Sequence, residues 1–131
     1  MRLPRLIPIL VVIGVIGASA PAGFVTATPV REVAVVNIAG PVEVQRMLLN
    51  GPYVFEHDTA RMARGEPCTA IYEFSPNGLG RKVLSFHCLP RESGTVEHFT
   101  MRVQRSFEMP ALRLTEYQFA GSGEAHGVPR R

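Results

Sequence analysis

Four histidines and two cysteines are the residues of this sequence whose side chains most readily do chemistry. His57 stands before a helix start, His87 adjoins Cys88, and His126 lies in a segment rich in glycine. Imidazole nitrogens are common ligands of zinc and copper. The sequence therefore allows a zinc or copper site at His57, His87 and His126, although it contains no His-x-His, Cys-x-x-Cys or helical histidine pair. The alternative is that these histidines are surface or capping residues.

Four charged residues lie near these candidates in the sequence. Asp58 follows His57, Arg61 and Arg64 are one helical turn apart, and Glu116 precedes the segment that holds His126. We expect them to support a metal site or to contact a partner. The simpler interpretation is a solvated helix face for the arginines, with an anion-binding pair as the alternative.

The two cysteines predict a disulfide. Residues 68–74 and 83–89 have the composition of two strands around a turn, and a turn centred on Gly78 places Cys68 opposite Cys88 and Thr69 opposite His87. Closing this loop of 19 intervening residues would stabilise the fold by roughly 3 kcal/mol. Two free thiols that bind a metal are the alternative.

An enzymatic alternative rests on one face of the same hairpin. Ser85 and His87 are two residues apart, and the predicted register brings Glu73 near them. This composition matches a catalytic triad, but the sequence has no Gly-x-Ser-x-Gly and a flat strand offers no oxyanion donors. A small hydrolase is therefore the weakest of the functional hypotheses.

Residues 1–27 have the pattern of an export signal. Arg2 and Arg5 precede the apolar residues 6–16, and small residues follow. An uncleaved anchor over residues 7–25 is the alternative. Removing residues 1–27 takes away two of the 14 basic residues and none of the 11 acidic ones, which leaves a net charge of +1. This balance argues against a nucleic-acid-binding surface and against a polybasic membrane-binding face.

The remaining chain predicts a mainly β single domain over residues 28–120 and a flexible tail over residues 121–131. A helix is expected over residues 58–65, with Asp58 as N-cap and Gly65 at its end. Asn50-Gly51 predicts a turn. The strand over residues 111–119 changes phase, which predicts a bulge near Thr115 and Glu116. The sum is a small antiparallel sandwich or barrel of six to seven strands with one short helix.

Four stretches of the sequence carry a resemblance. They are Phe55-Glu-His-Asp58, residues 60–69 (ARMARGEPCT), Phe86-His-Cys88 and residues 116–129 (EYQFAGSGEAHGVP). Together they resemble a family of small exported bacterial proteins of unknown function. The resemblance implies export and a single domain, and it implies no activity.

The sequence thus favours an exported domain, periplasmic or secreted, that is not an enzyme. We expect it to bind an envelope protein or a small ligand, without a cofactor, without nucleic acid and without a membrane contact after signal cleavage. The alternative function is a periplasmic protein that binds zinc or copper through histidines.

Overall fold

The computed structural model describes residues 28–131, so the predicted export signal lies outside the described residues. Within that range the chain forms eight strands and one helix: β1 (Arg31–Val44), β2 (Met47–Asp58), α1 (Thr59–Ala63), β3 (Thr69–Ser75), β4 (Gly78–Phe86), β5 (Leu89–Glu92), β6 (Thr100–Arg105), β7 (Leu112–Gln118) and β8 (Glu124–Gly127). The prediction of a mainly β fold with one short helix is confirmed. In the described part of the chain, no helix has the length and apolar character needed to cross a membrane.

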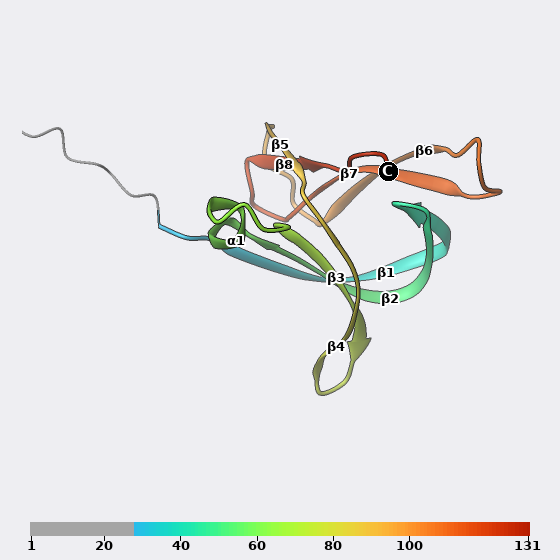
Figure 1. Ribbon diagram of the computed structural model, residues 1–131, viewed down its shortest axis with the longest axis horizontal. Helices are drawn as coiled ribbons and strands as arrows, with labels where there is room; N and C mark the ends of the chain where they lie inside the picture. The colour runs from blue at the N-terminus through green and yellow to red at the C-terminus, as the bar shows by residue number, and fades with distance from the viewer. Residues whose placement is uncertain (1–27) are drawn as a thin grey trace, which may run out of the picture.

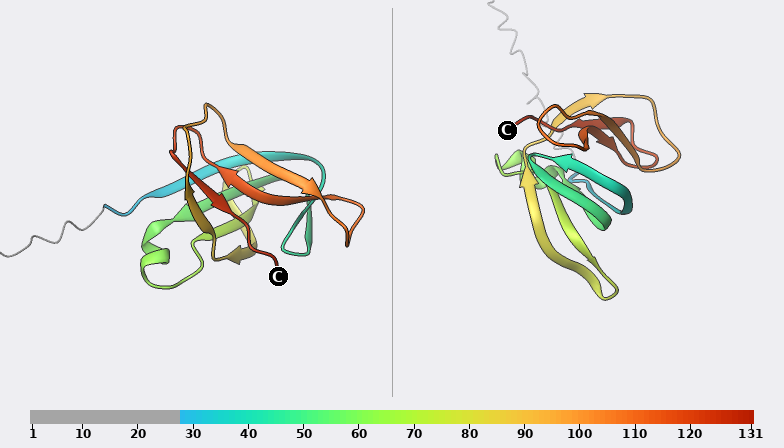
Figure 2. Two further views of the ribbon diagram at one scale, coloured as in Figure 1. Left: turned by 90° about the horizontal axis from the view of Figure 1, so that it is seen from above. Right: turned by 90° about the vertical axis from the view of Figure 1, so that its right-hand side faces the viewer.

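All eight strands belong to one curled sheet that forms a half-barrel (Figures 1 and 2). The order is β4-β3-β2-β1-β7-β8-β5, and β6 pairs with β7 outside this path. The sheet is mixed, because β1 and β7 meet in parallel at Val42↔Leu112 and Glu43↔Arg113. This short parallel contact joins two halves, β1–β4 and β5–β8, which curl over each other in Figure 2.

The long β1–β2 hairpin turns at a place that the sequence did not indicate. Val44 pairs with Met47, so the turn consists of Gln45 and Arg46, and both have positive φ, 48° and 71°. Two-residue turns of this kind match the twist of antiparallel strands. The turn predicted at Asn50-Gly51 is wrong: Gly51 lies inside β2, opposite Ile38, where the pairing is irregular.

The predicted register of the β3–β4 hairpin is also wrong. Thr69 pairs with Phe86 rather than with His87, and Ser75 pairs with Gly78, so the turn is Pro76-Asn77 and not Gly78. Two irregularities in the pairing then shift the strands further. The cysteines therefore lie just outside the paired segments, one before β3 and one after β4.

Three local predictions are confirmed. The Asp58 carboxylate caps α1 by accepting hydrogen bonds from the backbone N–H groups of Ala60 and Arg61. Gly65 follows the helix with φ +73°. In the β6–β7 pair, Arg102 faces Glu116 while Val103 faces Leu114, which leaves Thr115 as the extra residue of a bulge.

The bulge at Thr115 decides which side chains reach the core. It changes the phase of β7, so that both Leu114 and Tyr117 are buried. Tyr117 packs edge-on against Phe55 and Phe119, with ring centroids 5.6 and 5.7 Å apart. This aromatic cluster forms one wall of the site described below.

The segment 121–131 belongs to the domain. It contributes β8, which pairs with β5 on one side and with β7 on the other. Ala125 and His126 of β8 are fully buried. The predicted boundary at residue 120 therefore cuts through the sheet, and the description of this segment as a tail is corrected.

Candidate metal centre

Two of the predicted histidines meet in the interior although they are far apart in the sequence. His57 ends the buried stretch of β2, and His126 lies on β8 opposite Tyr117. Their ring centroids are 3.9 Å apart, with 35° between the ring planes. Tyr117 stacks on the His126 ring at 5.0 Å. The curl of the sheet brings these rings together, because β2 and β8 are not neighbouring strands.

Both cysteines adjoin the histidine pair. The Cys88 sulfur is 3.8 Å from Nδ1 of His126, and it is 2.6 Å from the Cys68 sulfur. The backbone N–H of Cys88 donates to the Cys68 sulfur at 3.1 Å. A disulfide bond has an S–S length of about 2.05 Å, so the two residues are free thiols in this structure. The predicted disulfide is not shown.

The donor atoms of His57, Cys88 and His126 all lie within 4.8 Å of one another, and all three side chains are buried. Around a tetrahedral zinc ion, with Zn–N and Zn–S bonds of about 2.0–2.1 and 2.3 Å, neighbouring donors are roughly 3.3–3.8 Å apart. A contraction of the order of 1 Å would therefore bring these atoms to ligand distances. The Cys68 sulfur lies beside the Cys88 sulfur but is not part of this group of three.

The imidazole nitrogens are short of hydrogen-bond partners. Within residues 28–131, no partner exists for either nitrogen of His57 or for Nε2 of His126, and all three atoms are buried. The nearest carboxylate is Glu32, whose Oε2 is 3.6 Å from Nδ1 of His57 and 3.7 Å from Nε2 of His126. Both distances are too long for hydrogen bonds. Glu124 comes within 3.6 Å of Nδ1 of His126 from the more exposed side.

The surroundings keep the site ready to act as a ligand set. Burial, and to a smaller extent the neighbouring His57, lower the pKa of His126 to about 4. His126 is therefore neutral near pH 7, as a metal ligand must be. The hydrogen bond from Cys88 lowers the pKa of the Cys68 thiol, while the same bond and burial raise the pKa of Cys88.

The third predicted histidine does not join the site. His87 is exposed, whereas its neighbours Phe86 and Cys88 are buried. The segment between β4 and β5 buries Cys88 in its place. No hydrogen bond links Ser85, His87 and Glu73 in the described residues, and Glu73 instead binds Arg81 at 2.7 Å. The triad arrangement is therefore not assembled.

The residues expected to support the site have other partners. Asp58 caps α1, and Arg61 binds Glu56 at 2.7 Å. Arg64 pairs with Glu66 at the surface. Glu116 binds Arg91 at 2.8 Å and also Arg102.

Sequence reasoning allowed metal-binding thiols as an alternative but did not combine Cys88 with His57 and His126, and it missed Glu32 as the nearby carboxylate. One signal for Cys88 was available: His87 and Cys88 are adjacent in an extended segment, so only one of them can face the interior. The expectation of a disulfide removed Cys88 from the candidate ligands. Glu32 pairs with His57 across β1 and β2, which the sequence does not indicate.

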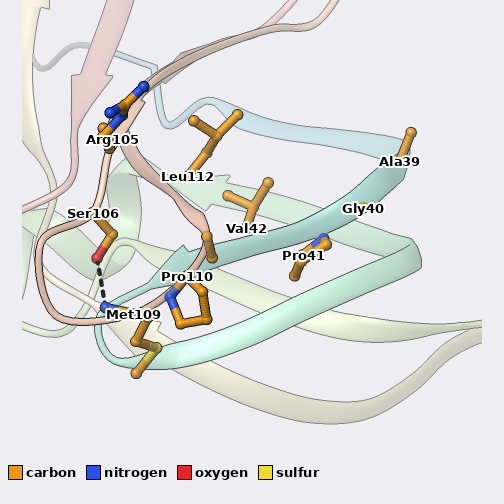
Figure 3. Close-up of a pocket in the computed structure, with 10 residues that line it drawn as sticks. Ala39, Gly40, Pro41, Val42, Arg105, Ser106, Met109, Pro110 and Leu112 are labelled. Atoms are coloured by element: carbon orange, nitrogen blue, oxygen red, sulfur yellow. Dashed lines mark hydrogen bonds between the residues drawn. The ribbon is translucent and has the colours of Figure 1, made fainter.

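A shallow groove lies at the opposite end of β1 from Glu32 (Figure 3). Its volume is about 540 Å³. It is lined by Ala39, Gly40, Pro41, Val42, Arg105, Ser106, Met109, Pro110, Ala111 and Leu112. Arg105 is the only titratable side chain in this lining. The groove therefore offers a contact surface, while the histidines and cysteines offer reactive chemistry.

Comparison with protein-family models, with curated proteins and with solved structures gives no match for this chain. The geometry of the site is therefore the guide to the function of this chain.

Proposed function

We propose that this protein binds a transition-metal ion through His57, Cys88 and His126, with Cys68 as the fourth donor. The observation that carries the proposal is the set of three buried imidazole nitrogens without hydrogen-bond partners beside two buried sulfurs. A buried polar group without a partner costs about 1–3 kcal/mol. A metal ion would satisfy several such groups at once, which gives the arrangement a physical reason.

The donor set points to a soft or borderline ion. Two sulfurs and two imidazoles form one of the common tetrahedral sets for zinc. Thiolate ligands also favour copper(I), whereas magnesium and calcium prefer oxygen ligands. Zinc or copper(I) is therefore the ion that we propose.

The proposal also includes the compartment in which the protein acts and a partner of the domain. We infer from the charge and apolar pattern of residues 1–27 that the protein is exported, to the periplasm or beyond the cell. A role as an interaction domain for an envelope partner is the second hypothesis, and the groove of Figure 3 is the surface that would serve it. The hypotheses differ at His57 and His126, which a metal protein requires and a docking surface does not.

The direct test is metal uptake by the reduced protein that begins at Thr28. Equilibrium dialysis against zinc should give one bound ion per chain with a Kd below about 1 μM, and cobalt(II) should give the absorption of a tetrahedral site with sulfur-to-metal charge transfer. The matched control is His87→Ala, which removes an exposed histidine next to Cys88. It should bind zinc as the unaltered protein does. Absence of uptake at micromolar zinc would rule the proposal out.

A further inference from the structure

The two cysteines of the site can serve two mutually exclusive chemistries. Their sulfurs are 2.6 Å apart. Disulfide formation would bring them to about 2.05 Å. Joint ligation of a tetrahedral zinc ion would separate them to roughly 3.8 Å, from two Zn–S bonds of about 2.3 Å. Small movements in opposite directions lead from this arrangement to either state.

The backbone around the cysteines favours a pair that stays together in both states. Cys68 directly precedes Thr69, and Cys88 lies two residues after Phe86, the partner of Thr69 in the β3–β4 hairpin. The hydrogen bond from the Cys88 backbone N–H to the Cys68 sulfur fixes the two chain segments next to each other. The sheet therefore holds the two side chains in reach of one another whether or not a metal is bound.

The histidines make the two states compete. The Cys88 sulfur lies 3.8 Å from Nδ1 of His126, on the side of the histidine pair. A sulfur that has formed a disulfide is no longer a thiolate and cannot act as a strong metal ligand. Oxidation would therefore leave only the two imidazoles, His57 and His126, as donors.

We propose that the Cys68–Cys88 pair is a redox switch that controls metal binding at this site, an inference that rests on the proposed function. The reduced pair holds the ion, and the disulfide releases it. The oxidant is a low-molecular-weight disulfide, RS–SR. The Cys88 sulfur, which has no proton while it ligates the ion, attacks one sulfur of RS–SR and expels RS⁻, and the Cys68 thiolate then attacks the Cys88 sulfur and expels the second RS⁻. Two electrons pass to the two R–S sulfurs, and the metal leaves with its charge unchanged.

The solvent exposure of the two cysteines determines which one reacts first, and metal ligation slows the oxidation of the loaded protein. Cys88 is 6 % exposed and is followed by Leu89, which is 61 % exposed, whereas Cys68 is 1 % exposed. Attack on the external disulfide therefore begins at Cys88. A bound ion occupies both thiolates, so the loaded protein should react more slowly than the metal-free protein.

The test uses the protein that begins at Thr28, prepared reduced, with zinc and glutathione disulfide as the probes. Zinc binding is first measured on the reduced form. The loaded protein is then treated with glutathione disulfide, and released zinc is followed together with the intact mass. We expect a mass loss of two hydrogens relative to the reduced protein, release of one zinc per disulfide formed, and recovery of zinc binding after a dithiol reductant. The oxidised form should bind zinc at least about 100-fold more weakly, since loss of a supporting residue alone costs ~10–100-fold.

A double variant, His57→Gln with His126→Gln, keeps both cysteines and removes the imidazole donors. It should form the same disulfide, and zinc should slow its oxidation less than it slows that of the unaltered protein. If the reduced protein binds no zinc, the proposed function and the switch both fail. If the reduced protein binds zinc and the oxidised protein binds it equally tightly, or if no intramolecular disulfide forms, the switch fails and the proposed function stands.

Discussion

Two neighbouring residues of β2 show how differently this sheet treats its two faces. Glu56 and His57 are each 1 % exposed. The Glu56 carboxylate forms ion pairs with Arg31 and with Arg61, the latter at 2.7 Å. The Tyr72 hydroxyl lies 3.4 Å from the same carboxylate. His57, on the opposite face, has no hydrogen-bond partner for either nitrogen among the described residues.

Strand β1 supplies a partner to each face. Arg31 extends to Glu56, and the next residue, Glu32, extends toward His57 and His126. Successive residues of a strand point to opposite faces, so one strand pair builds both clusters. In the outer cluster, formed by Glu56, Arg31 and Arg61, the opposite charges pair with one another, as in a structural ion-pair network. In the inner cluster, formed by His57, His126 and the two cysteines, imidazole nitrogens have no partner among the described residues unless a ligand binds. This difference distinguishes a candidate ligand site from a structural cluster.

The largest expected effect comes from removing an inner donor. His57→Gln or His126→Gln should weaken zinc binding on the order of 1,000-fold, beyond the ~10–100-fold that loss of a supporting residue costs. Competition against a chelator of known affinity measures it. The outer-face counterpart, Glu56→Gln, should leave zinc affinity unchanged. Equal losses of zinc affinity in the histidine variants and in Glu56→Gln would contradict the distinction between the two clusters.

The next effect is the pH dependence of the metal-free, reduced protein. The pKa of His126 is about 4 in the fold against about 6.5 in an unfolded chain. The unfolded chain therefore binds the proton first, and the stability from a neutral His126 is complete above pH ~6.5 and is lost as the pH falls toward 4. The loss should be about 3 kcal/mol, measured by urea unfolding. His126→Gln should show a flatter dependence over this range, and an unchanged slope would contradict the assignment.

A smaller effect is expected when the outer cluster is broken. Glu56→Ala leaves Arg31 and Arg61 without their shared acceptor. Both arginines are partly exposed, with 56 % and 29 % exposed side chains, so water compensates in part and the loss of stability should be about 2 kcal/mol. Urea unfolding checks this, while zinc affinity should stay as it was. A change in zinc affinity would show that the two faces are coupled.

The smallest effect concerns the carboxylate that faces both rings. The Glu32 carboxylate lies beside both imidazoles without a hydrogen bond to either. Its negative charge favours a bound cation, so Glu32→Gln should weaken zinc binding about tenfold, at the lower end of what supporting residues contribute. The comparison is Glu124→Gln. The Glu124 carboxylate is 3.6 Å from Nδ1 of His126 but is more exposed than that of Glu32, so this change should have less effect. A loss as large as that of His57→Gln would make Glu32 a ligand.

Local patterns in the sequence predicted the helix cap and the bulge correctly but placed two turns wrongly. The cap at Asp58 and the bulge at Thr115 both follow from signals a few residues long, a capping side chain and a change of phase. The turn at Gln45-Arg46 was missed because neither residue type favours positive φ. Strand β8 was missed because it has four residues after a glycine-rich segment, too few to show an alternation.

The candidate site was predicted only in part, for a different reason. Residue type alone identified His57 and His126, and their meeting depends on the order in which β7 and β8 join the sheet. The choice between His87 and Cys88 depends on which one the chain turns inward, and that follows from the shifted hairpin register. Both features depend on the whole sheet, so no short segment of the sequence predicts them.

The spacing of the donors along the chain has a consequence for biogenesis. From His57 to His126 the site spans 69 positions (126 − 57), and its members come from four separate segments rather than from a chelating motif of nearby residues. An unfolded chain would therefore compete poorly for the ion, whereas a chain in which β8 has docked would capture it. An occupied site would then indicate a domain that has already folded. The ion would stabilise the folded domain after β8 has docked, and it would not initiate folding.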